Sequence, residues 1–66
     1  MQLVINGEQR TVEHSDTVAK LLAELSLDPR AVVVELNRVI IRRPALESTT
    51  LAEGDSVEIV HFVGGG

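Results

Sequence analysis

A single apolar helical stripe, set between stretches with the pattern of β-strands, limits the folds open to this chain. Its members recur at i, i+3, i+4 and i+7: Val18, Leu21, Leu22 and Leu25. This spacing is typical of an amphipathic helix that buries one face. Ser15 and Asp16 are suitable N-cap residues before the stripe, and Pro29 stops the helix from continuing. We expect a helix over residues 17–25 whose leucines pack against a β-sheet.

Two hairpins and one further strand account for the β-like segments. Asn6-Gly7 is the strongest sequence signal for a two-residue hairpin turn, because both central positions need positive φ. Asn37-Arg38 marks a second tight turn, and Pro44 can open a single helical turn through Glu47. The second strand of the first hairpin is the more polar, as is typical of a sheet edge. The expected strands cover residues 1–5, 8–13, 31–36, 39–41 and 56–63.

The order of these elements is hairpin, helix, hairpin, short turn and final strand. It predicts an α+β fold of the ubiquitin-like β-grasp type, with a mixed sheet and one main helix packed on one face. The apolar character of the first and last strands favours a parallel pair at the centre of the sheet. We expect residues 1–63 to form this domain and residues 64–66 to form a flexible C-terminal glycine tail.

The charge balance argues against a nucleic-acid partner. The chain has ten acidic and six basic residues, and its only basic pair, Arg42-Arg43, is too small for a phosphate footprint. We interpret this pair as solvated rather than as a contact with an acidic partner. A net charge of −4 suits a partner with a basic docking groove. Without an apolar run of about 20 residues or a basic, apolar leader, we expect no membrane partner and a cytoplasmic location.

The short chain leaves little room for an enzyme's pocket. A chain of about 60 residues buries only roughly 60% of its unfolded surface, so its core is small. With no cysteine, neither a disulfide nor a cysteine-based metal site is possible. His61 and His14 stand alone in the sequence, without an acidic or nucleophilic companion, and we interpret both as structural. We therefore assign no catalytic residue, no metal site and no bound cofactor.

The three glycines at the end of the chain are where chemistry can take place. Gly64, Gly65 and Gly66 add no packing and are costly to order, so they are not present for stability. Without β-carbons they can enter a narrow slot and reach about 10 Å beyond the folded body. The carboxylate of Gly66 is ionised at neutral pH and needs activation before it can react. No phosphate-binding glycine motif is present, so a partner must supply the ATP chemistry.

Several motifs together resemble the ThiS family of ubiquitin-like sulfur carriers from thiamine (thiazole) biosynthesis. They are residues 1–7 (MQLVING), 17–22 (TVAKLL), 34–38 (VELNR) with Ile40 and Ile41, and 54–66 (GDSVEIVHFVGGG). The resemblance implies a carrier rather than an enzyme. It implies that an E1-like adenylating enzyme (ThiF-like) uses ATP and Mg to adenylate Gly66, which is then converted to a thiocarboxylate. A thiazole synthase (ThiG-like) would accept the sulfur.

The last strand carries a candidate docking surface. Alternation places Val57 and Ile59 toward the helix, and Val60 and Phe62 on the opposite face. A large apolar residue beside the tail is typical of a site for a partner protein. We hypothesise that Val60 and Phe62 seat the carrier on its adenylating enzyme. The alternative is a bulge that turns Phe62 inward.

Three other functions remain open at this stage. A carrier of the same fold could deliver sulfur to molybdopterin or to another thio-product. A protein-tagging modifier would join Gly66 to lysines of other proteins. A regulatory or interaction domain would leave the tail passive.

Overall fold

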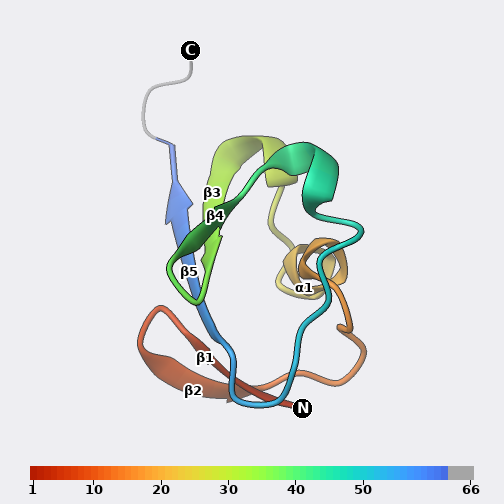
Figure 1. Ribbon diagram of the computed structural model, residues 1–66, viewed down its shortest axis with the longest axis vertical. Helices are drawn as coiled ribbons and strands as arrows, with labels where there is room; N and C mark the ends of the chain where they lie inside the picture. Colours follow the sequence, from red (N-terminus) through yellow and green to blue (C-terminus); the bar gives the residue numbers. More distant parts are fainter. Residues whose placement is uncertain (63–66) are drawn as a thin grey trace.

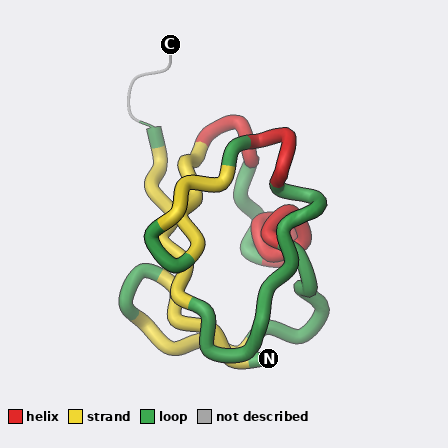
Figure 2. Tube along the Cα trace, viewed as in Figure 1, coloured by secondary structure: helices red, strands yellow, loops and turns green. Residues whose placement is uncertain are grey.

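The computed structural model describes residues 1–62, which form one mixed β-sheet with a helix across one face (Figure 1). In Figure 2 the strands gather on one side of the molecule and the helix lies on the other. This arrangement confirms the predicted ubiquitin-like β-grasp fold. The elements are β1 (Gln2–Ile5), β2 (Glu8–Thr11), α1 (Val18–Glu24), the short 3-10 turn η1 (Pro29–Ala31), β3 (Val32–Leu36), β4 (Val39–Ile41), the 3-10 turn η2 (Arg43–Ala45) and β5 (Ser56–His61).

The final strand lies at the centre of the sheet, whose order is β2-β1-β5-β3-β4. It pairs parallel with β1, where Val4 faces Ser56 and Ile5 faces Val57. On its other side it pairs antiparallel with β3 along five residues, from Val32 opposite His61 to Leu36 opposite Val57. The predicted parallel pairing of the first and last strands is therefore confirmed. The strands β2 and β4 form the two edges.

Both hairpin turns place two consecutive residues at positive φ. Asn6 and Gly7 have φ values of 49° and 82°, and Asn37 and Arg38 have values of 50° and 71°. This is the geometry of the two-residue turns that match the twist of a hairpin. The first turn uses the favoured Asn-Gly pair, whereas the second holds an arginine where glycine is preferred.

The two turn asparagines also fasten the hairpins to β5. The side-chain carbonyl of Asn6 accepts a hydrogen bond from the Ile59 N–H (2.7 Å), and its amide donates to the Ile59 carbonyl (3.1 Å). Asn37 accepts a hydrogen bond from the Ser56 N–H at 2.9 Å. Each side chain thus satisfies backbone groups of the central strand that the neighbouring short strands leave unpaired.

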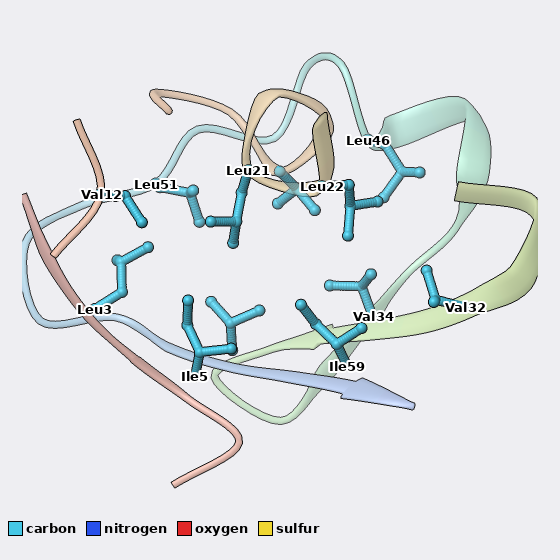
Figure 3. Close-up of a cluster of buried hydrophobic side chains, with 12 residues drawn as sticks. Leu3, Ile5, Val12, Leu21, Leu22, Val32, Val34, Leu46, Leu51 and Ile59 are labelled. Carbon is cyan, nitrogen blue, oxygen red and sulfur yellow. The ribbon is translucent and has the colours of Figure 1, made fainter. Parts of the chain in front are cut away.

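The hydrophobic core fills the space between the sheet and α1 (Figure 3). Leu21 and Leu22 point from the helix toward side chains of β1, β3 and β5. Leu46 and Leu51, from the long connection after β4, close the core on the helix side. The fully buried members, less than 2% exposed, are Leu3, Val18, Leu21, Leu22, Val34 and Val57.

The helix begins one residue later than predicted, and its cap differs. Thr17, not Ser15 or Asp16, is the N-cap, and its hydroxyl accepts a hydrogen bond from the Lys20 N–H at 3.2 Å. Ser15 is buried and donates instead to the carboxylate of Glu24 at 2.5 Å. Ser15, Asp16 and Thr17 all have side-chain oxygens that can cap a helix, and the contact of Ser15 with Glu24 removes Ser15 from this role.

The structure also corrects several strand ends. Ala31 belongs to η1 rather than to the third strand, because Asp28 caps this turn by accepting a hydrogen bond from the Arg30 N–H at 2.8 Å. In η2 Pro44 is the second residue rather than the first. The strand β2 ends at Thr11 and β5 at His61, so both are shorter than expected. Among the helices of residues 1–62, none has the length and apolar character needed to cross a membrane.

Candidate functional site

The residues with the strongest predicted role lie outside the described residues. These are Gly64, Gly65 and Gly66. The predicted boundary between domain and tail, after Val63, also lies outside the described residues. What the structure shows is the part of the chain that leads to them. This part is β5 and Phe62, the last residue described.

The end of β5 is held in a fixed place. Val57 and Ile59 are buried in the core at 0% and 6% exposure, so the strand cannot shift along its axis without moving both. The Phe62 N–H donates to the carbonyl of Ala31 in η1 at 2.9 Å. Figure 1 shows β5 running toward the end of the molecule where η1 and η2 lie. The described part of the chain therefore ends at a defined place, beside these two turns.

The predicted docking residues lie on the sheet face that the helix leaves uncovered. Val60 is 59% exposed and Phe62 is 63% exposed. Phe62 does not turn inward, so the alternative with a bulge is wrong; the pairing of β5 with β3 is regular through His61. Both residues are exposed, as the alternation along the strand predicts, and their role in docking stays a prediction.

Two further apolar residues enlarge this surface. Val33 lies directly opposite Val60 across the β3–β5 pair, and Ile40 of β4 is 57% exposed. We call Val33, Ile40, Val60 and Phe62 the open-face patch. Sequence reasoning missed Val33 and Ile40 because it did not fix the register of β3 and β4 against β5. The signal was present in the uninterrupted apolar run of β4, since an edge strand with one solvated face is expected to alternate.

Neither histidine contacts another residue of the range 1–62 in an arrangement typical of acid–base or nucleophilic catalysis. His61 and His14 are exposed, and neither imidazole forms a hydrogen bond with another residue in the range 1–62. Within the same range, no group of three or more His, Cys, Asp or Glu side chains is arranged to hold a metal ion.

Two carboxylates with lowered pKa values, Glu24 and Asp28, stabilise loops. The hydrogen bond from Ser15 is the main cause that lowers the pKa of Glu24, and the hydrogen bond from Arg30 is the main cause for Asp28. A carboxyl group that acts as a general acid near neutral pH needs a raised pKa. Both shifts go the other way, so these two groups fit structural roles.

Comparisons with known proteins agree with one another. The model of the ThiS family matches residues 3–66. The sulfur carrier protein ThiS of Bacillus subtilis is 38% identical over 65 residues, which cover 97% of this chain and 98% of that protein. A thiazole synthase of Paramagnetospirillum magneticum is 47% identical over all 66 residues, but the chain spans only 20% of its length. The crystal structure of a thiamine biosynthesis protein (ThiS) from Geobacter metallireducens, 39% identical, superposes with a TM-score of 0.84 over the whole of both chains.

Proposed function

Because the chain belongs to the ThiS family, we propose that it is a sulfur carrier protein of thiamine biosynthesis, a protein cosubstrate that partner enzymes act upon. The observation that carries this proposal is the extent of the family match, which continues through the three glycines to Gly66. The likeness to the Bacillus subtilis sulfur carrier, over nearly the full length of both proteins, supports it.

The reacting group is the α-carboxylate of Gly66. As an ionised carboxylate it is a poor electrophile at neutral pH. An E1-like (ThiF-like) enzyme activates it: a carboxylate oxygen attacks the α-phosphorus of ATP, and pyrophosphate leaves. A sulfur nucleophile then attacks the acyl carbon of the adenylate and AMP leaves, so that one carboxylate oxygen is replaced by sulfur. ATP and Mg belong to the partner, and this chain binds no cofactor of its own.

The glycines give the partner access to this group. Gly64 and Gly65 carry no β-carbon, so the chain before Gly66 fits a slot too narrow for other residues. Phe62 and Val60 remain on the folded body and contact the partner while the glycines enter its active site. The thiocarboxylate then delivers its sulfur to a thiazole synthase (ThiG-like). The likeness to a protein named thiazole synthase supports this choice of acceptor.

Intact-mass measurement tests the proposal. The purified protein is incubated with a ThiF-like enzyme, MgATP and a sulfur donor, and we expect a mass increase equal to the difference between sulfur and oxygen. The mass before reaction shows whether the purified protein ends at Gly66. A variant with tryptophan added after Gly66 serves as the control and stays unconverted. The proposal fails if the Bacillus subtilis carrier is converted by the same preparation and this protein is not.

A further inference from the structure

A groove of about 210 Å³ lies beside the end of β5. It is formed where β3 and β4 meet the turns η1 and η2, and Phe62 lines it from the last described position of the chain. Its apolar lining includes Val33, Ile40 and Phe62 of the open-face patch, and Leu46 from the core. The groove is therefore continuous with the proposed docking face.

The charge around this groove is opposite to that of the whole molecule. The protein has a net charge of −4 and only six basic residues, yet three of them line the groove: Arg30, Arg42 and Arg43. Arg30 pairs with Asp28 at 3.1 Å. Arg42 and Arg43 form no ion pair with any of residues 1–62. Two guanidinium groups are thus left for a partner, next to exposed apolar side chains.

The backbone holds these two arginines in place. Arg42 is extended and precedes η2, where its carbonyl accepts a hydrogen bond from the Ala45 N–H at 2.9 Å. Arg43 opens the turn, and its carbonyl accepts from the Leu46 N–H at 3.1 Å. Leu46 is only 5% exposed, so the core anchors the turn. The backbone of this rim is therefore ordered before binding, and only the two side chains lose conformational entropy when they bind.

We propose that this groove binds an acidic segment of the adenylating enzyme that also presents an apolar side chain. Carboxylates of the segment pair with Arg42 and Arg43, and its apolar side chain packs against Ile40 and Phe62. Arginine suits this role because its planar guanidinium binds a carboxylate through two parallel hydrogen bonds. The identity of the partner rests on the proposed function. On this proposal Arg42 and Arg43 contact an acidic partner when the complex forms and are solvated in the free protein.

Charge reversal with a matched control tests the groove. The variant R42E/R43E is compared with R10E/R38E, which makes the same change of net charge at exposed arginines that do not line the groove. Affinity for the ThiF-like enzyme is measured by calorimetry at low and high salt. We expect Kd to rise about tenfold or more for R42E/R43E at low salt, equivalent to roughly 1.4 kcal/mol. The control should change Kd by less than about threefold.

A milder pair of variants separates charge from geometry. R42K/R43K keeps both charges but loses the planar fork, and we expect an intermediate loss of affinity. Urea unfolding of each variant checks the fold, and R42Q/R43Q replaces the reversal if that variant does not fold. Equal affinities for R42E/R43E and R10E/R38E would overturn the proposal. The proposal would also be overturned if inorganic phosphate weakened binding of the enzyme while R42K/R43K bound the enzyme as tightly as the unchanged protein. That result would mean that the groove attracts any anion and does not recognise a carboxylate segment.

A groove that does not bind the enzyme can be distinguished from a protein that is not a sulfur carrier. With saturating adenylating enzyme, R42E/R43E should still reach full conversion to the thiocarboxylate, because the groove acts only in binding. An R42E/R43E variant that binds normally but is not converted contradicts a docking role. If the unchanged protein itself is never converted, the proposed function is at fault, and the affinity comparison still decides whether the groove binds the enzyme.

Discussion

Arg38 is held in a backbone conformation that its side chain disfavours. Its φ of 71° lies in the left-handed region, where the β-carbon of an L-residue crowds the following carbonyl at a cost of roughly 1–2 kcal/mol. Within residues 1–62 its guanidinium makes no hydrogen bond or ion pair that would offset this cost. The turn is nevertheless kept because Asn37 before it binds β5.

Replacing Arg38 with glycine should therefore stabilise the protein. We expect R38G to raise the free energy of unfolding by about 0.5–1 kcal/mol, after the greater freedom of glycine in the unfolded chain is subtracted. Urea unfolding at neutral pH measures this change. R38A is the control, because it removes the guanidinium but keeps the β-carbon. If R38G is no more stable than R38A, the φ value is not a source of strain.

At the scale of elements, Glu24 joins the helix α1 to the loop before it. Its carboxylate accepts hydrogen bonds from the Ser15 hydroxyl at 2.5 Å and from the Glu13 and His14 N–H groups at 3.2 and 3.3 Å. These bonds, that from Ser15 first, hold the pKa of Glu24 below its ordinary value of 4.5. Glu24 thus binds protons less readily in the folded protein than in the unfolded chain.

Linkage gives the sign of the resulting pH dependence. The contribution of Glu24 to stability is fully present above pH 4.5 and is lost as the pH falls through its lower folded-state pKa. We expect E24Q to be less stable than the unchanged protein at pH 7, and the gap to close as the pH falls below 4.5. Urea midpoints from pH 7 to acid pH measure this gap. The control is E47Q, which changes an exposed residue in the loop that follows η2. If the stability difference between E24Q and the unchanged protein did not vary with pH, the contribution assigned to the Glu24 carboxylate would be wrong.

The elements that sequence reasoning found are those fixed by local chemistry. Asn6-Gly7 determines the first turn, and the leucine spacing determines α1, whatever the rest of the chain does. The N-cap at Thr17 and the turn η1 were missed because several capping residues stand close together in the sequence. Only tertiary contacts, such as that between Ser15 and Glu24, select among them.

At the scale of the whole molecule, some parts of the candidate site follow from local sequence and others depend on tertiary contacts. The glycines and the outward direction of Val60 and Phe62 follow from the sequence, since a terminal motif and strand alternation are both local. The groove does not, because its lining comes from β3, β4, η1, η2 and Phe62, which meet only in the folded protein. The family match covers residues 3–66 as a unit and so assigns both the folded body and the glycines to the ThiS family.

If the folded body docks on the partner and the tail reacts, a substitution at an exposed docking residue should weaken binding without lowering the free energy of unfolding. Phe62 is 63% exposed, so F62S should change the free energy of unfolding by no more than about 0.5 kcal/mol. On the proposed function, the same change should weaken binding of the adenylating enzyme about tenfold or more, as the loss of an aromatic anchor does.

V39S is the matched control for this experiment. Val39 is 61% exposed, close to the 63% of Phe62. It lies on the edge strand β4 opposite Leu36, which packs against the core. Val39 is therefore outside the open-face patch. Both variants lose an exposed apolar side chain, and only F62S should lose affinity in calorimetry. Because neither residue takes part in the acyl chemistry, saturating enzyme should convert both variants fully. An F62S protein that binds as tightly as V39S would mean that the aromatic ring is not a contact, and that the glycines enter the partner without support from the open-face patch.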